Sequence, residues 1–283
     1  MSALIGASME FARALFTRGT DIFGPEELKQ VFGIELAEVP PIPFSEGKLK
    51  RARELEQVLV FFAPNVTMQM VHDIRGNKTS DNCPLLYNTD WYKNESFYMN
   101  DPVRVGWRLV SRECVPNSRD EHYLGQTKKL CEYLVEVYDS DLPDLVREAV
   151  AEFCVQTQEL AELLDRDWRE AAKRLTSLRL NQMFRETPAE ALYVLALYEA
   201  VNHERLLPSG SWSWTNKLAS YGNIVYVGNF DGYGARVNDD YPGYGDGALG
   251  FRFSRSGTLE MRQVNGRCPP PGQGGGLTHC RVL

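Results

Sequence analysis

Residues Ser220–Asp246, SYGNIVYVGNFDGYGARVNDDYPGYGD, carry most of the information about the fold and its use. Of these 27 residues, 19 are Tyr, Gly, Asn, Asp or Ser. Tyrosine offers a large amphipathic surface at a small entropic cost, and Ser, Gly and Asn offer adaptable hydrogen bonds, so antibody binding loops are rich in them. The mixture therefore indicates a ligand-binding surface. A turn-rich β region that happens to carry tyrosines is the alternative.

Within this stretch, the residues from Ile224 predict a β-strand, because its side chains would point to opposite faces at each step. We expect Val225 and Val227 to face the core, and Ile224, Tyr226 and Asn229 to face solvent. A register shift of one residue would invert this assignment. The aromatic residues Trp212, Trp214, Phe251 and Phe253 are expected to belong mostly to the framework. The predicted ligand-binding residues are Tyr221, Asn223, Tyr226, Asn229, Asp231, Tyr233, Asn238, Asp239, Asp240, Tyr241, Tyr244 and Asp246.

Five residue types, Lys, Glu, Gln, Met and Trp, are absent between Leu218 and Leu259. All five require a purine at the third codon position. Codons that end in a pyrimidine cannot encode them but do encode Asn, Asp, Tyr, Ser and Gly. The absence is therefore suggestive of a segment with restricted codons, although turn-rich sequence also disfavours long charged side chains.

The first half of the chain predicts two regions. Residues 1–56 form an N-terminal helical segment with a Pro-rich linker; helices are expected near Ile5–Thr17, Pro25–Phe32 and Lys48–Gln57, and an extended stretch at Val39–Pro43. Residues 57–112 look strand-like, separated by Asn, Asp and Gly turns. The expected strands are Val58–Phe62, Pro84–Tyr87, Phe97–Met99 and Val103–Val110.

Helical periodicity returns over residues 120–202. Its clearest helix starts at Thr187, where Thr187, Pro188 and Glu190 form the pattern of a capping box. From Leu206 the chain is glycine-rich and β-like, and Ser211–Thr215 opens this stretch. Short strands are expected at Ile224–Val227, Ala235–Val237 and Leu249–Phe253. Because helices and strands come in blocks, we expect an α+β fold with an antiparallel sheet. Residues 256–283 are expected to be a flexible Pro/Gly-rich tail.

Charge and composition limit the partners. The net charge of −7 and a pI near 5.3 argue against nucleic acid as the main partner, since phosphate binding needs a basic surface. No apolar run suggests a membrane span, and the start lacks a signal peptide, which makes the cytoplasm the default location. The six cysteines are expected to be free thiols. A Cys268–Cys280 disulfide is the alternative in an oxidising environment.

Catalytic and metal-binding patterns are weak, so we predict no enzyme activity, no cofactor and no metal. The four histidines, His72, His122, His203 and His279, have no carboxylate or cysteine at a telling spacing. No glycine-rich phosphate loop opens a helix. The acidic run that starts at Asn238 lacks the spacing of a twelve-residue calcium loop and is better explained as a solvated turn.

Three segments resemble the target (variable) proteins of diversity-generating retroelements. They are Asn202–Leu207 leading into Ser211–Thr215, then Val225–Gly232, and finally Leu249–Arg255; upstream, Gly106–Ser111 resembles an early core strand of such domains. The resemblance implies a C-type lectin-like domain over residues 57–255, related to the formylglycine-generating enzyme fold. It also implies a hypervariable region at 220–246.

The implied function is display of a diversifiable C-terminal surface to an unknown protein or glycan ligand. Two other classes stay open: a fixed-specificity lectin or phage-type adhesin, and an enzyme on the formylglycine-generating enzyme-like scaffold. No cysteine or other catalytic residue of those enzymes can be transferred to this chain.

Overall fold

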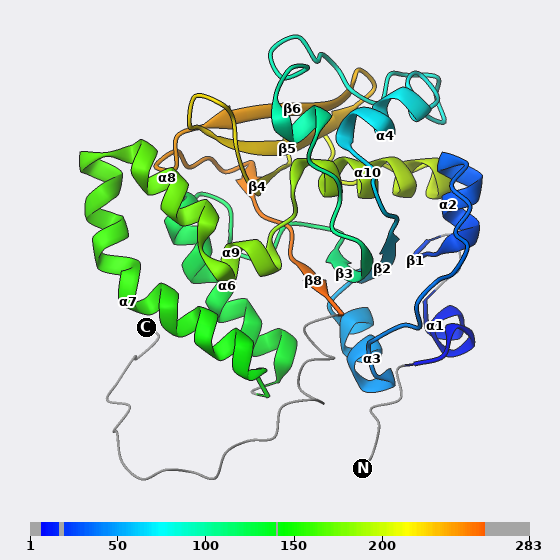
Figure 1. The fold of residues 1–283 in the computed structure, drawn as a ribbon, viewed down its shortest axis with the longest axis horizontal. Coiled ribbons are helices and arrows are strands. Elements are labelled where there is room, and N and C mark those ends of the chain that lie inside the picture. Colours follow the sequence, from blue (N-terminus) through cyan, green and yellow to red (C-terminus); the bar gives the residue numbers. More distant parts are fainter. Residues whose placement is uncertain (1–6, 17–19, 140, 258–283) are drawn as a thin grey trace.

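The computed structural model describes residues 7–16, 20–139 and 141–257, which combine helices with two four-stranded sheets (Figure 1). The first sheet has the order β1-β2-β3-β8 and the second the order β6-β5-β4-β7. Most neighbouring strands are antiparallel, whereas β1–β2 and β4–β7 are parallel. The predicted α+β class is confirmed. The strands are β1 (Ile22–Phe23), β2 (Gln57–Phe62), β3 (Gly106–Ser111), β4 (Trp212–Leu218), β5 (Ile224–Asp231), β6 (Gly234–Asp240), β7 (Leu249–Gly250) and β8 (Ser254–Ser256).

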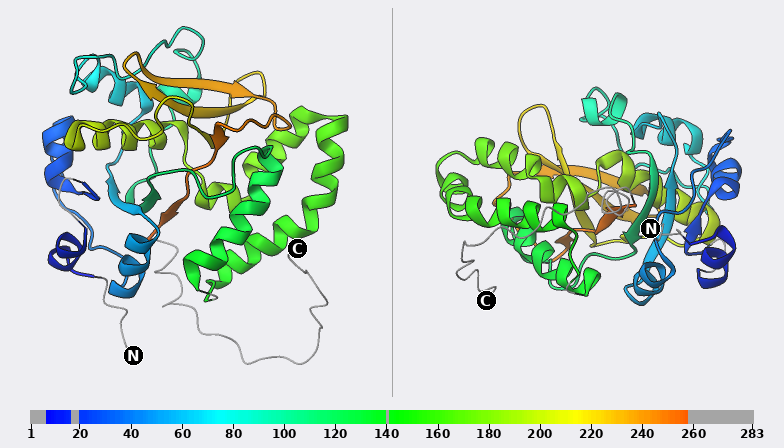
Figure 2. Two further views of the ribbon diagram at one scale, coloured as in Figure 1. Left: turned by 180° about the vertical axis from the view of Figure 1, so that it is seen from behind. Right: turned by 60° about the horizontal axis from the view of Figure 1, so that its bottom comes forward.

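Figure 2 shows the blue N-terminal helices on one side of the molecule and the green central helices on the opposite side, with further helices between them. None of the described helices is both long and apolar enough to cross a membrane. They are α1 (Met9–Leu15), α2 (Pro25–Phe32), α3 (Glu46–Glu54), α4 (Met68–Arg75), α5 (Ser96–Met99), α6 (Tyr123–Tyr138), α7 (Asp144–Arg166), α8 (Trp168–Ser177), α9 (Arg179–Phe184) and α10 (Pro188–Asn202).

Helix α10 runs between the two sheets and is buried on all sides from Pro188 to Glu199 (Figure 1). Its predicted capping box is confirmed: Thr187 Oγ1 accepts from the Glu190 backbone N–H at 3.1 Å, and Glu190 Oε2 accepts from the Thr187 N–H at 3.0 Å. The Tyr193 hydroxyl donates to the Phe61 carbonyl at 3.0 Å, which ties the helix to β2. A helix enclosed in this way needs apolar residues all round, as its sequence has.

The core consists of two hydrophobic clusters, and β5 contributes to both. Val225 and Val227 pack into the cluster around α10, as predicted. Ile224 and Tyr226 pack into the second cluster, together with residues of α6 to α9. The prediction that Ile224, Tyr226 and Asn229 face solvent is wrong, since they are only 0%, 6% and 8% exposed. The alternation of β5 is right, but helices cover the face that was expected to be open.

The region 57–112 contains more helix than its sequence suggested. Phe97–Met99, expected as a strand, lies in α5, and α4 was not anticipated. Helix α4 begins after Thr67, whose Oγ1 accepts from the Met70 backbone N–H at 3.2 Å. Pro84–Tyr87 forms a single bridge between Leu86 and Ala235 and no strand of its own. Short apolar runs do not distinguish a buried helix turn from a strand, which explains these errors.

The described part of the N-terminal segment shares the main core. Strand β1 pairs in parallel with β2, and Phe16, Phe23 and Phe32 belong to the cluster around α10. At the other end of the chain, the predicted tail lies outside the described residues from position 258 onward. The Cys268–Cys280 alternative lies there too. Cys83 and Cys114 are free thiols.

Candidate binding surface

Two of the predicted ligand-binding residues belong to the framework. The Tyr226 ring packs edge-on against Trp212 and Trp214, with ring centroids 5.1 and 5.0 Å apart, and burial raises the pKa of its hydroxyl. Asn229 has a φ of +47°, and its Oδ1 accepts from the Gly210 N–H at 2.7 Å. Neither side chain is available to a ligand. The sequence missed the burial of Tyr226 because the helices that cover this face of β5 lie far upstream.

Eight predicted residues gather at the end of the β5–β6 hairpin where β5 begins, and we call them the base group. Asp239 organises part of it, because its carboxylate accepts from the Tyr221 hydroxyl at 2.6 Å and from Asn223 Nδ2 at 2.7 Å. Burial, and then the hydrogen bond to Asp239, raise the pKa of Tyr221, so its hydroxyl stays protonated at neutral pH. The base group comprises Tyr221, Asn223, Asn238, Asp239, Asp240, Tyr241, Tyr244 and Asp246.

The exposed side chain of Tyr241 contacts helix α8. Its ring meets that of Trp168 edge-on, with centroids 6.4 Å apart, and the Arg169 guanidinium lies 4.3 Å above the Trp168 ring. Arg169 also donates from Nε to the Tyr221 carbonyl at 3.4 Å. Trp168 and Arg169 were not predicted, because nothing in the sequence indicates that α8 lies beside a segment more than fifty positions later.

Hydrogen bonds fix the loops that carry the base group. Ser220 donates from its backbone N–H and its hydroxyl to the Glu95 carboxylate, at 2.9 and 2.7 Å. The Tyr123 N–H donates to the Pro242 carbonyl at 3.1 Å, which attaches the loop after β6 to the start of α6. The exposed side chains are therefore presented by loops with a defined backbone, which lowers the entropic cost of binding.

The two remaining predicted residues, Asp231 and Tyr233, lie at the opposite end of the hairpin and form the tip group. Asp231 accepts from the Tyr233 N–H at 2.8 Å and from Arg236 at 3.2 Å, and the Arg236 guanidinium lies 4.8 Å above the ring of Tyr87. At roughly 3.3 Å per strand residue, β5 separates the two groups by about 23 Å. A small ligand would therefore contact only one of them.

The segment Tyr87–Tyr92 supplies further aromatic residues beside β6. The Trp91 indole N–H donates to the Val237 carbonyl at 3.1 Å, and Tyr87 is 55% exposed. This segment, YNTDWY, has the same Tyr, Asn, Asp and Trp composition as a binding loop. Applying the composition argument of residues 220–246 to the whole chain could have found it.

The surface offers aromatic faces, amides and carboxylates, which suit recognition. Burial, and then the neighbouring Asp239, raise the pKa of Asp240, although its hydrogen bond from the Tyr241 N–H opposes them. No group of three or more His, Cys, Asp or Glu side chains suited to a metal ion occurs among the described residues. The geometry favours stacking and hydrogen bonding with a ligand.

Comparisons of the sequence and the structure with known proteins found no match. No protein-family model matches the sequence. No curated protein matches it, and no solved structure matches it either.

Proposed function

We propose that this chain is a ligand-binding protein whose base group forms a diversifiable binding surface, as in the variable proteins of diversity-generating retroelements. The observation that carries the proposal is the contrast between Tyr226 and Tyr241. The first is 6% exposed and locked between two tryptophans, whereas the second is 45% exposed beside Trp168 and Asp240. A buried frame next to a solvent-exposed aromatic and amide surface is what a variable binder requires.

We also propose that the domain is C-type lectin-like. The pairing of β3, an early strand, with β8, the last described one, supports this proposal, as does the second sheet that lies between them in sequence. Strand β3 coincides with Gly106–Ser111, and β8 overlaps Leu249–Arg255 at Ser254 and Arg255; both segments carry the resemblance. Closing a domain by pairing an early strand with a late one leaves the loops between them free to vary.

The frame is suited to substitutions at its surface. Thr215 Oγ1 donates to the Val225 carbonyl at 2.7 Å, so β4 and β5 are joined by a side chain as well as by backbone hydrogen bonds. Exposed positions away from such contacts usually change stability by no more than about 0.5 kcal/mol when substituted. The exposed members of the base group can therefore vary with little effect on folding.

The charge of the surface favours a protein or glycan ligand over nucleic acid. The base group carries three aspartates, Asp239, Asp240 and Asp246, and the cation Arg169 lies beside it. An acidic surface repels phosphate backbones. Exposed tyrosines and a tryptophan are the residue types that dominate binding energy at protein interfaces.

A display library tests whether the surface can be diversified. Tyr221, Asn238, Asp240, Tyr241 and Asp246 would be randomised in the full chain, and the library selected against hen-egg lysozyme as a basic protein probe. A control library would randomise Tyr226, Asn229, Trp214, Val225 and Val227. We expect the first library to remain folded and to yield lysozyme binders, and the control library to unfold. A first library that unfolds like the control, or yields no binder, would refute the proposal.

Genomic DNA tests whether residues 220–246 are diversified in nature. We expect a near-copy of the codons for residues 220–246 beside a reverse-transcriptase gene, with differences only at adenines. A surrounding genome without such a copy would contradict diversification and leave a binder of fixed specificity.

A further inference from the structure

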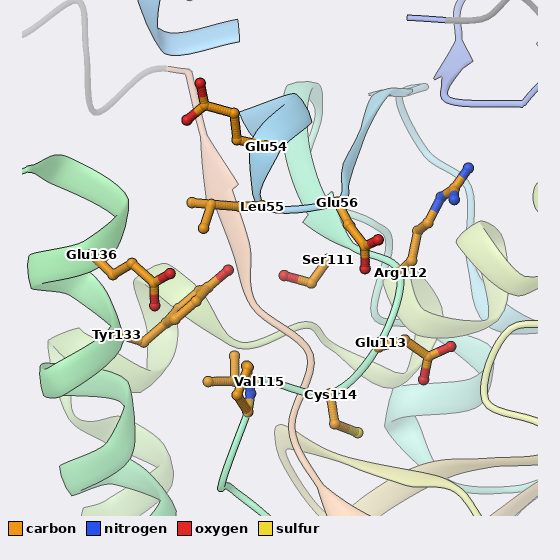
Figure 3. Close-up of a pocket in the computed structure, with 11 residues that line it drawn as sticks. Glu54, Leu55, Glu56, Ser111, Arg112, Glu113, Cys114, Val115, Tyr133 and Glu136 are labelled. Carbon is orange, nitrogen blue, oxygen red and sulfur yellow. The ribbon is translucent and has the colours of Figure 1, made fainter. Parts of the chain in front are cut away.

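A cavity of about 250 Å³ lies where the start of β2, the end of β3 and α6 meet (Figure 3). Leu55, Val115 and the Tyr133 ring supply apolar lining. The volume is about eight times the ~30 Å³ that a water molecule occupies in the liquid, which is enough for a small organic molecule. The lining contains no residue of the base or tip group, so this site is independent of the proposed function.

The charges around the cavity are mostly negative. Four glutamates line it, and the one basic side chain in the lining is Arg112. The Arg112 guanidinium is already engaged, since it binds the buried carboxylate of Asp21 and lies 5.6 Å above the Tyr198 ring. It therefore does little to neutralise the glutamates, and the cavity favours a cation. The lining glutamates are Glu54, Glu56, Glu113 and Glu136.

The negative charge of the glutamates is only partly neutralised. Arg51 forms ion pairs with both Glu54, at 3.0 Å, and Glu136, at 3.9 Å, so a single positive charge is shared by two carboxylates. Figure 3 shows Glu136 on one side of the cavity and Glu56 on the other, with Ser111 and Leu55 between them. Carboxylates set apart in this way suit a ligand with two separate positive groups better than a single metal ion, which needs converging oxygens.

A buried hydroxyl points to a ligand independently of the glutamates. Ser111 is only 5% exposed, and its Oγ has no hydrogen bond of normal geometry among the described residues, although the Tyr133 hydroxyl lies near it. Figure 3 shows this hydroxyl directed into the cavity. Nearby, Gln57 Oε1 is also buried without a partner, while Gln57 Nε2 donates to the Tyr133 hydroxyl at 3.5 Å. Buried polar atoms are nearly always hydrogen-bonded, so these acceptors call for a donor.

We propose that this cavity binds a short aliphatic diamine. One ammonium group would lie near Glu56 and the other near Glu136, and the methylene chain would pack on Leu55 and Val115. Ser111 Oγ would accept a hydrogen bond from an ammonium N–H. An ammonium group offers three donors and no acceptor, which complements a site that presents carboxylates and an orphaned hydroxyl oxygen.

Titration calorimetry of the full-length protein with 1,4-diaminobutane tests the proposal. We expect saturable binding at one site, weakened as ionic strength rises because the glutamates are exposed to solvent. The neutral probe 1,4-butanediol has the same chain length and should not bind. Absence of saturable diamine binding, or equal binding of the diol, would overturn the proposal.

Substitutions then locate the site. The double change Glu56→Gln and Glu136→Gln should weaken diamine binding about tenfold or more, because it removes one carboxylate from each side. Glu132→Gln removes a charge from the same helix outside the cavity lining and should change binding less than twofold. Equal weakening by Glu132→Gln would mean that only the overall charge matters, which would overturn the assignment.

A second variant covers the case in which the double change fails to fold. Leu55→Trp fills the cavity without altering any charge, so it should abolish diamine binding and leave the melting temperature within a few degrees of the wild type. Diamine binding that survives in a folded Leu55→Trp protein would place the ligand elsewhere and refute the site.

Discussion

Arg252 and Glu186 form a bidentate ion pair with both side chains almost completely buried. Arg252 Nε donates to Glu186 Oε2 at 2.9 Å, and Nη2 donates to Oε1 at 2.7 Å. Their backbones are tied to one strand, because the Arg252 N–H donates to Ser213 Oγ at 2.9 Å and the Asn216 N–H donates to the Glu186 carbonyl at 3.0 Å. The pair thus joins the segment before β8, the start of α10 and strand β4.

We expect Arg252→Met to lower the free energy of unfolding by about 3–5 kcal/mol, because it leaves the Glu186 carboxylate buried without its cation. Urea denaturation measures the effect. The double variant Arg252→Met with Glu186→Leu removes both charges and should recover much of the loss. If the double variant is as unstable as the sum of the single variants, the two side chains do not interact as the geometry implies.

The burial of Tyr226 predicts a clear contrast between two tyrosines of the same hairpin region. Tyr226→Ala should lower the free energy of unfolding by about 3–5 kcal/mol, since it removes a ring packed between Trp212 and Trp214. Tyr241→Ala, at an exposed position, should cost less than about 1 kcal/mol. Thermal and urea denaturation of both variants would check this. Similar costs at the two positions would contradict the division between frame and surface.

Two glycines of the β5–β6 turn region should respond differently to the same substitution. Gly234 has a φ of +108°, and a Cβ there would lie 2.7 Å from the Tyr87 backbone nitrogen, so Gly234→Ala should cost about 2 kcal/mol or more. Gly232 has no atom within 4 Å of such a Cβ, so Gly232→Ala should change stability by less than about 0.5 kcal/mol. Urea denaturation would measure both. A neutral Gly234→Ala would show that the 84–87 segment is not held against β6.

Elements with strong local signals were predictable from the sequence. Helix α2 has its predicted bounds, Pro25–Phe32, because a proline suits its first turn and Gly33 ends it in the left-handed region with φ +68°. The capping box at Thr187 correctly placed the start of α10. The alternation of side chains predicted strand β5, and it correctly predicted that Val225 and Val227 face the core. These features depend on residues close together in sequence.

The misplaced features depend on contacts between distant segments. Tyr226 was expected on the surface because alternation indicates which residues share a face but not what covers that face. Trp168 lies beside Tyr241 only because of how α8 packs on β4, which no local pattern encodes. For the same reason α5 was not predicted: it is a single turn, and its aromatic residues Phe97 and Tyr98 are typical of a strand. Whether a segment forms a helix or a strand depends mainly on its own residues, whereas the exposure of its side chains depends on distant segments that pack on it.

The buried carboxylate of Glu190 predicts how stability depends on pH. Burial alone would raise its pKa, but Arg104 and Arg108 lie close and lower it to about 2, from an ordinary value of 4.5. Arg104 Nε donates to Glu190 Oε1 at 2.7 Å. A carboxyl group with a lowered folded-state pKa stabilises the protein above its unfolded pKa, and this contribution is lost as the pH falls from 4.5 toward 2. The shift corresponds to about 3 kcal/mol.

We therefore expect the difference in unfolding free energy between wild type and Glu190→Gln to shrink by about 3 kcal/mol between pH 5 and pH 2. Urea denaturation at several pH values measures this difference. The exposed Glu162→Gln serves as the control, and its difference from wild type should stay within about 0.5 kcal/mol over the same range. A Glu190→Gln difference that does not change with pH would mean that the carboxylate gains nothing from Arg104. The cap at Thr187 would then act through its hydrogen bonds alone, and the charge of Glu190 would not stabilise the start of α10.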